Sequence, residues 1–422
     1  MKKNPSLIVS VIGLGYIGLP TAAMLASRRV HVIGVDVNEV AVDSVNKGRI
    51  HIVEPGLDII VHSVVTEGYL RATTVTEPAD AFLIAVPTPF KGDYEPDLAY
   101  VKAATEAVAK VLRKGNVIIL ESTSPVGTTE QMVQWLSELR PDLAFPIAGS
   151  EESDVYVAYC PERVLPGQVV RELVNNDRII GGINAISAEK AKEIYRIFVE
   201  GELVVTNSRT AEMSKLTENA YRDVNIAFAN ELSLICDRLH INVWELISLA
   251  NHHPRVNILQ PGAGVGGHCI AVDPWFIVNK TPEQARLIRA AREINDGKPD
   301  WVVAEIRSAI DQIVVKGKAR NEIKVALLGL AFKPNIDDLR ESPAIYIAER
   351  VIQELDAKVM LVEPNIDCLP PRFDGFQLAD AEKAVREADV VAVLVKHSAF
   401  LNLEFSSATG QIVVDAVGLT AH

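Results

Sequence analysis

Short apolar runs alternate with helix-like segments through the first third of the chain. Residues 7–12 are continuously apolar, as expected for a strand that is buried on both faces. Residues 31–35, 81–86 and 116–120 have the same character, and residues 98–112 show a helical pattern between the last two runs. This alternation predicts a parallel sheet built from right-handed βαβ units.

The last hundred residues repeat the theme. Apolar strands are expected at 323–328, 358–362 and 411–414, with a helix over 343–355 after the first of them. The sequence "ADVVAVLVKH", which ends at His397, is a counterpart of "ADAFLIAVPTP" in the first third. The chain therefore contains two related α/β halves.

The middle of the chain has a helical sequence pattern in place of the alternating strands and helices. No proline or glycine occurs from residue 208 to 240, which predicts one long helix, and a second helix is expected over 243–250. A glycine-rich loop follows, before more helix from about residue 281. We predict three parts: 1–205, a helical middle at 206–315, and 316–422.

Composition narrows the class of protein. Of the 422 residues, 48% are hydrophobic and 23% charged, which is typical of a soluble globular protein. The net charge of −13 argues against a nucleic-acid surface. The four cysteines are scattered without a CxxC pair, so we expect reduced thiols and neither disulfides nor a metal site.

The amino terminus superficially resembles a signal peptide or a short membrane span, because "MKK" precedes the mostly apolar residues 7–26. Three glycines and Pro20 within that run would make a poor spanning helix, and the pattern continues into a regular strand. We therefore expect a cytoplasmic protein that does not contact membranes.

A dinucleotide-binding fingerprint opens the chain. Gly13, Gly15 and Gly18 follow the first strand, and Asp36 ends the next one. The glycines allow a tight turn, a close approach of pyrophosphate to the backbone, and close helix packing. The Asp36 carboxylate can accept hydrogen bonds from a ribose diol and would repel a 2′-phosphate, which favours NAD over NADP. The alternative is a glycine-rich turn that binds no ligand.

The C-terminal half lacks this fingerprint. Gly329 is followed by the charged loop "LAFKPNIDDLRES", in which Lys333 and Arg340 could meet phosphates. A loop held only by its own salt bridges explains the same residues equally well.

A thiol in the glycine-rich loop "GAGVGGHCIAVD" suggests oxidation of an aldehyde through a thiohemiacetal and a thioester. Lys215, Asn219 and Arg222 share one stripe of the long helix and could support Cys269. Asp273, four residues after the thiol, could act as a base or hold the lysine.

Glu162, in "CPER", is a candidate for activating water in the hydrolysis step. Each candidate has an ordinary alternative. A loop cysteine is more often simply buried, a polar helix stripe is usually solvated, and Cys160 is interpreted as packing.

Taken together, the residues resemble the UDP-glucose/GDP-mannose dehydrogenase family from end to end. The matching segments, in the family's order, are "VIGLGYIGLP", "AVPTP", "ESTSPVG", "CPER", "AEMSKLTENAYRDVNIAFANEL", "GVGGHCIAVDP" and "LGLAFKPNIDDLRESP". The resemblance implies two Rossmann-like domains, for NAD and for the UDP-sugar, joined by a long central helix that forms most of a homodimer interface. It also implies oxidation of a nucleotide-sugar C6 alcohol to a carboxylate with two NAD⁺.

The resemblance implies roles for individual residues. The catalytic set is Cys269 as nucleophile, Lys215 for the oxyanion or proton, Asn219 and Asp273 in support, Thr123 for the water, and Glu162 for hydrolysis. The cofactor set is Gly13, Gly15, Tyr16, Ile17, Gly18, Asp36, Thr88, Thr123 and Arg340. The substrate set is Arg163, Val164, Lys215, Asn219, Arg222, His253, Arg255, Gly266, Phe332 and Lys333.

Four positions distinguish this chain from other family members. His268 and Arg163 stand where UDP-glucose enzymes typically carry Ser and Phe, which favours an N-acetylated sugar, with UDP-N-acetylmannosamine preferred. Pro166 replaces a second glutamate, and Val417 replaces a basic residue that touches the cofactor in relatives. The product would feed surface polysaccharide synthesis such as that of enterobacterial common antigen.

Other functions remain open from the sequence. UDP-N-acetylglucosamine and UDP-glucose are alternative substrates. A catalytically silent NAD-binding regulatory protein would keep the fold without the chemistry. A cysteine hydrolase would leave Asp36 and the first glycine turn unexplained.

Overall fold

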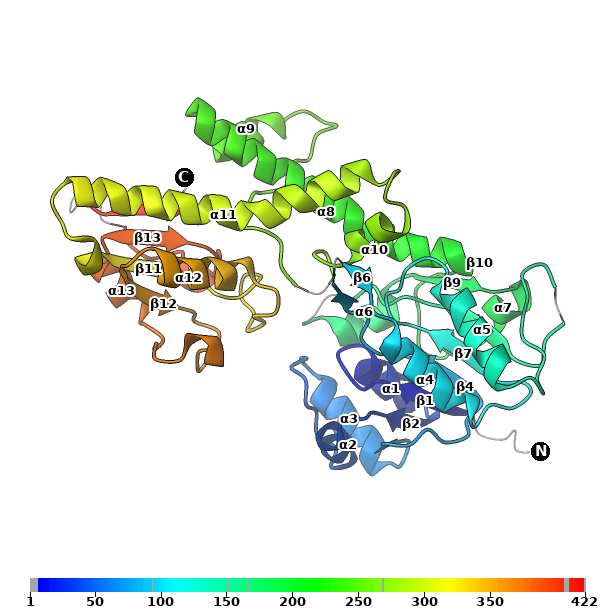
Figure 1. The fold of residues 1–422 in the computed structure, drawn as a ribbon. Helices are drawn as coiled ribbons and strands as arrows, with labels where there is room; N and C mark the ends of the chain where they lie inside the picture. Colours follow the sequence, from blue (N-terminus) through cyan, green and yellow to red (C-terminus); the bar gives the residue numbers. More distant parts are fainter. Residues whose placement is uncertain are drawn as a thin grey trace. The chain divides into compact units, whose positions relative to one another are not determined.

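The computed structural model describes residues 7–92, 94–150, 152–164, 167–267, 269–405 and 410–420. The chain divides into two compact units, Met1–Glu218 and Asn219–His422. Figure 1 draws the first in blue to green and the second in green to red.

An eight-stranded sheet forms the centre of the first unit, in the order β10-β9-β8-β7-β4-β1-β2-β3. All neighbouring strands are parallel except β8 and β9, which pair antiparallel. The strands are β1 (Ile8–Ile12), β2 (His31–Val35), β3 (Leu70–Thr73), β4 (Ala81–Ile84), β7 (Val117–Leu120), β8 (Tyr156–Tyr159), β9 (Arg178–Gly182) and β10 (Leu203–Asn207). A separate two-stranded ribbon pairs β5 (Phe90–Lys91) with β6 (Glu95–Pro96).

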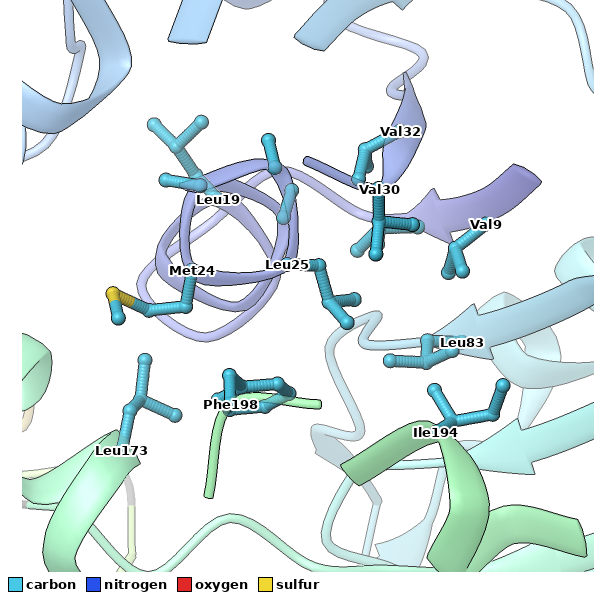
Figure 2. Close-up of a cluster of buried hydrophobic side chains, with 14 of the residues drawn as sticks. Val9, Leu19, Met24, Leu25, Val30, Val32, Leu83, Leu173, Ile194 and Phe198 are labelled. Carbon is cyan, nitrogen blue, oxygen red and sulfur yellow. The ribbon is translucent and has the colours of Figure 1, made fainter. Parts of the chain in front are cut away.

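Helices cover both faces of this sheet. They are α1 (Gly18–Ser27), α2 (Glu39–Asn46), α3 (Leu57–Thr66), α4 (Ala99–Ala109), α5 (Thr128–Leu139), α6 (Val169–Asn175), α7 (Ala185–Tyr195) and the start of α8 (Ser208–Leu239). Figure 2 shows one of the two resulting cores, where Leu25 of α1 lies among Val9, Leu83 and Phe198. The second core packs α4 and α5 on the opposite face.

Helix α1 is buried along nearly its whole length, from Gly18 to Ala26. Its small residues Thr21, Ala22 and Ala23 let strands and neighbouring helices approach closely, so the helix can be surrounded by protein. This placement brings the start of α1 to the carboxyl end of β1.

The second unit contains a four-stranded parallel sheet in the order β12-β11-β13-β14. Its strands are β11 (Lys324–Leu328), β12 (Lys358–Val362), β13 (Val390–Val393) and β14 (Ile412–Asp415). Its helices are the rest of α8, α9 (Val243–Ala250), α10 (Asp273–Lys280), α11 (Arg286–Val315), α12 (Pro343–Glu354) and α13 (Ala381–Glu387), with short 3-10 turns at Arg320–Glu322, Pro371–Phe373 and Ser398–Phe400.

Alternate residues of β11 face two different cores. Val325 and Leu327 pack against α11 and α12, whereas Ala326 and Leu328 pack against α13. This alternation follows from the period of two along a strand. The predicted architecture of two parallel α/β sheets with a helical middle is confirmed.

The middle of the chain departs from prediction at the start of helix α10. Helix α10 begins at Asp273, directly after the cysteine loop, whereas helix was expected only from about residue 281. Its Pro274 lies in the first turn, where a missing N–H costs nothing. Helix α11 continues through Pro299, which is buried in the helix interior, so tertiary packing overrides the local preference to end there.

None of the helices within the described residues is long and apolar enough to cross a membrane.

Candidate active site

The first glycine turn has steric reasons for its glycines. Gly13 has φ +92° and donates its N–H to the Val35 carbonyl at 2.8 Å. A Cβ on Gly18 would lie 1.7 Å from the Gly13 oxygen, so only glycine fits there. A Cβ on Gly15 would meet nothing within 4 Å, so the backbone borders open space at the position predicted for the pyrophosphate.

Asp36 lies half-buried at the carboxyl end of β2 and supports this turn. Its Oδ2 accepts the Leu14 N–H at 2.8 Å, and its Oδ1 accepts the Asn38 N–H at 2.9 Å. Each carboxylate oxygen keeps a further lone pair for a ribose hydroxyl. Tyr16 and Ile17 lie in the same turn, where Tyr16 is 37% exposed. These residues fit a dinucleotide.

The loops after β4 and β7 are tied together at the same edge of the sheet. Thr88 donates its hydroxyl to the Thr123 carbonyl at 2.5 Å, and Ser122 donates to the Val86 carbonyl at 2.7 Å. The structure thus places two predicted cofactor residues, Thr88 and Thr123, side by side.

Glu162 is 8% exposed, and each of its carboxylate oxygens accepts one hydrogen bond. Its Oε2 accepts from Arg178 at 2.8 Å, and its Oε1 accepts the Arg163 N–H at 2.6 Å. Because Arg178 is itself 3% exposed, this is a buried ion pair, whose geometry fixes the direction of the Glu162 carboxylate.

A second buried carboxyl group belongs to this cluster and was missed by sequence reasoning. Glu121 follows β7, and its Oε1 accepts from the Tyr195 hydroxyl at 2.6 Å. Its Oε2 is buried and has no hydrogen-bond partner among the described residues. Burial raises the pKa of Glu121 to about 7, although the Arg178 charge opposes the shift. The only signal was its place after a strand, inside "ESTSPVG".

Cys160 lies within the same cluster and packs in the core, as expected. It is fully buried, and burial raises the pKa of its thiol to about 12, so it remains a neutral thiol.

Arg163 is committed to neighbours within the first unit. Its guanidinium pairs with Glu218 of α8 at 2.7 Å and donates to the Asp177 carbonyl at 3.1 Å. Val164 is partly buried against the core. Any substrate contact from Arg163 would therefore be made by a guanidinium that Glu218 orients.

Helix α8 carries Lys215, Asn219 and Arg222, as predicted. Lys215, in the first unit, is 9% exposed, whereas Arg222, in the second, is exposed. The three positions form one stripe by helical periodicity, which runs from buried to exposed.

Cys269 is an exposed cysteine outside any disulfide and lies just before α10. Its carbonyl accepts the Asp273 N–H at 2.8 Å, which closes the first turn of that helix. The Asp273 side chain is buried and accepts a hydrogen bond from the Asn219 amide. The structure therefore brings together three predicted catalytic residues of the second unit.

Three of the glycines before Cys269 are required for close packing. A Cβ on Gly266 would lie 2.4 Å from the Glu341 oxygen and 2.8 Å from Phe332 Cβ. A Cβ on Gly267 would lie 2.9 Å from the Phe332 ring, and Gly264 lies against Pro343. The loop from β11 to α12 thus packs directly against the cysteine loop.

A buried polar network, also missed from the sequence, holds the start of this loop. The Gly262 N–H donates to Asn230 of α8 at 2.9 Å, and Asn230 donates to Asn295 of α11 at 2.8 Å. Asn295 and Arg292 both donate to Asp223, at 2.8 and 2.6 Å. Isolated polar residues on long helices give no signal of such a network.

The remaining predicted ligand residues lie on the surface. Lys333 is exposed, and Arg340 pairs with Asp338 at 2.6 Å. His253 and Arg255 are exposed in the turn after α9, where the Arg255 N–H donates to His253 Nδ1.

Two positions that bear on substrate choice, His268 and Pro166, lie outside the described residues. Val417 donates its N–H to Asp415 at the end of β14. Within the described residues, no cluster of three or more His, Cys, Asp and Glu side chains could hold a metal ion.

Comparison with known families matches nearly the whole chain. Residues 7–199 match the NAD binding domain of the UDP-glucose/GDP-mannose dehydrogenase family, 209–297 its central domain, and 326–422 its UDP binding domain. The predicted NAD cofactor is thereby confirmed, and Gly13, Gly18 and Asp36 lie within the matched NAD binding domain.

The chain is similar to individual relatives over almost its full length. It is 61% identical to the UDP-N-acetyl-D-mannosamine dehydrogenase of Escherichia coli (strain K12), covering 97% of this chain and 98% of the relative. It is 59% identical to the NDP-N-acetyl-D-galactosaminuronic acid dehydrogenase of Ralstonia nicotianae, covering 97% and 96%. The solved structure of the UDP-D-ManNAc dehydrogenase from Pyrococcus horikoshii aligns with a TM-score of 0.87 at 38% identity, covering 98% of this chain and 96% of that one.

Proposed function

The chain belongs to the UDP-glucose/GDP-mannose dehydrogenase family of NAD-dependent oxidoreductases, and from this premise we propose that it oxidises UDP-N-acetyl-D-mannosamine at C6 to the uronate. The observation that carries the choice of sugar is the near-full-length similarity to UDP-N-acetyl-D-mannosamine dehydrogenases. The product would enter surface polysaccharide synthesis of the enterobacterial common antigen type, from a cytoplasmic enzyme.

The cofactor is proposed to bind over the first glycine turn. The amides at the start of α1 would meet the pyrophosphate, Asp36 the adenosine ribose, and Thr88 and Thr123 the part of the cofactor beyond the strand ends. When bound, NAD⁺ supplies the hydride acceptor for both oxidation steps. Arg340 would reach the same cofactor from the C-terminal domain.

Cys269 is proposed as the covalent nucleophile. The C6 alcohol first loses a hydride and a proton to give an aldehyde, to whose carbon the thiol adds, with its proton passing to the oxygen. A second loss of hydride and proton gives a thioester, and water then breaks the C–S bond, releasing the carboxylate and restoring the thiol. One sugar, two NAD⁺ and one water thus yield one carboxylate, two NADH and three protons.

Asn219, Asp273 and Lys215 support this chemistry. The Asn219–Asp273 hydrogen bond fixes a carboxylate one helical turn from Cys269, where it can accept protons. The Lys215 ammonium would stabilise the oxyanion of the thiohemiacetal and of the hydrolysis step.

Glu162 is proposed to assist hydrolysis of the thioester, with Thr123 holding the water. The buried Arg178 holds the Glu162 carboxylate in one orientation, which suits a base that must accept a proton from water. Since Pro166 replaces the second glutamate of relatives, Glu162 would carry this role alone.

The substrate would lie between the cysteine loop and the charged loop after β11. Phe332, which lies against Gly266, and the exposed Lys333 would meet the nucleotide part. Arg163 with Val164 would line the sugar site. The exposed cations Arg222 and Arg255 would neutralise the diphosphate, and the exposed His253 would hydrogen-bond to it.

A homodimer through α8 is proposed from its exposed apolar face. Tyr221, Phe228, Ile235 and Leu239 are 72%, 51%, 46% and 60% exposed, and their spacing of seven, seven and four places them on one side of the helix. The domain division 1–205, 206–315 and 316–422 follows the same proposal, with α8 in the middle part. Sedimentation of Phe228→Glu, against wild type, tests the dimer.

The reaction is tested by incubating the protein with NAD⁺ and each of UDP-N-acetylmannosamine, UDP-N-acetylglucosamine, UDP-N-acetylgalactosamine and UDP-glucose. We expect two NADH per sugar with the first alone. Turnover with the galactosamine sugar instead would favour the activity named for the Ralstonia relative. Absence of turnover with every sugar would contradict the proposal.

The covalent route is tested by Cys269→Ala, with Cys368→Ala as a matched control because it removes the other exposed thiol. We expect the first variant to release no uronate and the control to behave as wild type. Full activity of Cys269→Ala would exclude the thioester route.

A further inference from the structure

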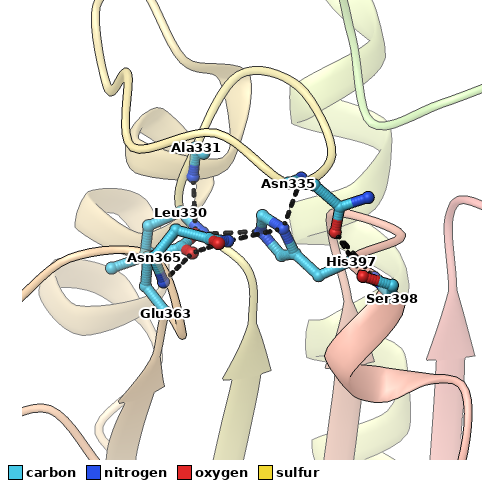
Figure 3. Close-up of polar contacts among 7 residues, drawn as sticks. All are labelled: Leu330, Ala331, Asn335, Glu363, Asn365, His397 and Ser398. Atoms are coloured by element: carbon cyan, nitrogen blue, oxygen red, sulfur yellow. Dashed lines mark hydrogen bonds and ion pairs between the residues drawn. The ribbon is translucent and has the colours of Figure 1, made fainter. Parts of the chain in front are cut away.

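A buried polar network lies at the carboxyl end of the sheet in the second unit. Glu363 follows β12 and His397 follows shortly after β13, on the two sides of the central strand β11. Glu363 is 4% exposed and His397 is 0% exposed. Figure 3 shows both side chains converging on the loop that leaves β11.

Glu363 gathers the first amides of that loop. Its Oε2 accepts the N–H groups of Leu330 at 2.7 Å and Ala331 at 2.9 Å, and also faces His397 Nε2 at 3.0 Å. Burial opposes its charge, but these hydrogen bonds outweigh the burial and lower the pKa of Glu363 to about 2. The carboxylate therefore remains an acceptor throughout the physiological range.

The ring of His397 is oriented by its partners. Its Nδ1 faces the Asn335 backbone N–H and the Asn365 side-chain amide, both at 2.9 Å. A backbone N–H can only donate, so Nδ1 is the acceptor and the proton of the neutral ring lies on Nε2, directed at Glu363. One imidazole thus links Glu363 to the far part of the loop.

Asn335 is held at a second point. It has φ +62°, a left-handed conformation in which asparagine is one of the few tolerated residues, and its Oδ1 accepts from the Ser398 N–H and hydroxyl, each at 2.8 Å. A further hydrogen bond closes the loop beyond Asn335, where the Asp338 carbonyl accepts the Phe332 N–H at 3.1 Å. Residues 330–338 are therefore fastened at both ends.

The fastened loop carries the side chains that face the cysteine loop and solvent. Phe332 lies against Gly266 and Gly267, while Lys333 is exposed. A loop held in one conformation before binding loses less entropy when a ligand binds.

We propose that His397 is a positioning residue, which together with Glu363 holds loop 330–338 in the conformation that binds the uridine diphosphate of the substrate. The identity of the ligand rests on the proposed function. His397 itself touches neither the substrate nor the reacting atoms.

Two variants of the full-length protein test the two hydrogen-bonding sides of the His397 imidazole one at a time. His397→Asn retains an acceptor oxygen near the Nδ1 position, whereas His397→Gln retains only the donor toward Glu363. Val391→Ala is the control, because it removes buried volume from β13 without touching the loop. Calorimetry measures binding of UDP and, separately, of NAD⁺, and hydrogen exchange measures the amides of residues 330–335.

For His397→Gln we expect UDP affinity to fall about five- to tenfold, the KM for the nucleotide sugar to rise with kcat unchanged, and the Asn335 amide to exchange faster. His397→Asn and Val391→Ala should remain within about twofold of wild type, and NAD⁺ affinity should not change.

Wild-type UDP affinity in His397→Gln, or an equal loss in Val391→Ala, would overturn the inference. Failure of the wild type itself to bind UDP would contradict the proposed function instead. Hydrogen exchange would then test whether His397 holds the loop. Faster exchange of the loop amides in His397→Gln alone would support this role, and unchanged exchange would refute it.

Discussion

The two α/β sheets begin with the same turn and use it differently. Gly13 and Gly329 follow the first strand of each sheet, with φ +92° and +95°, and both donate their N–H at 2.8 Å to the last residue of the neighbouring strand. The next amide, of Leu14 or Leu330, donates to the acid after that strand, Asp36 or Glu363.

The acids differ in availability. Asp36 is half-buried and binds two backbone amides, so it can still accept from a ribose. The longer Glu363 is buried and binds two loop amides, His397 and Asn365. The connection to the following helix also lengthens, from residues 14–17 to 330–342. The same strand–turn backbone therefore suits a dinucleotide at Gly13, where the acid is accessible and the helix starts close to the turn. It does not suit one at Gly329, where the acid is buried and the helix starts farther along the chain.

The largest effects are expected from alanine at the paired turn glycines. A Cβ on Gly13 would lie 2.4 Å from the Ala85 oxygen, and one on Gly329 would lie 2.5 Å from Val395 Cβ. Both variants combine a clash with a left-handed φ, so each should lose about 3 kcal/mol or more of stability. Thermal unfolding with NAD⁺ or UDP should show Gly13→Ala losing NAD⁺ stabilisation and Gly329→Ala losing UDP stabilisation. Loss of UDP stabilisation in Gly13→Ala, or of NAD⁺ stabilisation in Gly329→Ala, would contradict the assignment of one ligand to each turn.

Glu121→Gln should change how stability depends on pH in the first unit. The folded pKa is about 7 and the ordinary value 4.5, so between these values the unfolded chain ionises while the folded protein keeps its proton. Stability therefore falls with rising pH across that window, by about 3 kcal/mol. Glutamine cannot ionise, so denaturant unfolding at pH 8 should show a more stable variant. A variant less stable than wild type at pH 8 would show that Glu121 is not held as the neutral acid.

Glu363→Gln is the counterpart with the opposite sign. Its folded pKa of about 2 lies below the ordinary 4.5, so its stabilisation is present above pH 4.5 and is lost as pH falls toward 2. The variant should lose about 1.5–3 kcal/mol at pH 7 because its amide cannot accept all the loop N–H groups. Unfolding between pH 5 and 2.5 should be steeper for wild type than for the variant. Parallel curves would contradict this assignment.

Asp36→Asn should weaken NAD⁺ binding about tenfold or more, because a charged acceptor for the ribose is lost. UDP binding, measured in parallel by calorimetry, should remain at the wild-type value. Equal NAD⁺ affinity would mean that Asp36 serves only the turn, as Glu363 does.

The smallest effect on stability is expected from Gly15→Ala. A Cβ there meets nothing, so the free energy of unfolding without cofactor should stay within about 0.5 kcal/mol of wild type. NAD⁺ affinity should nevertheless fall, because the methyl group would occupy the open space beside the backbone. Undiminished affinity would place the pyrophosphate elsewhere.

Local features of the fold and site were predictable from sequence. The strands over His31–Val35 and Lys358–Val362 and the helix Val243–Ala250 are as predicted, because their apolar periodicity is set by adjacent residues. The turn around Gly13 and the acid Asp36 were equally local.

The polar clusters were not predictable, because their members lie far apart in the chain. Tyr195 meets Glu121 across 74 residues, and His397 meets Glu363 across 34. Single buried polar residues carry no periodic signal, and their partners are chosen by the order of strands in the sheet. The start of α10 was predicted wrongly for a related reason, because its first turn is closed by the Cys269 carbonyl and not by a side-chain cap.

The packing of the cysteine loop also limits how this enzyme can be re-engineered. Gly264, Gly266 and Gly267 have no room for a Cβ against Phe332 and Pro343, so randomising them in a library would mostly yield misfolded clones. Substitutions in the cysteine loop, in the laboratory or over evolutionary time, are then tolerated mainly at positions other than these glycines. The close packing beside Cys269 therefore limits which mutations of this loop give a folded protein.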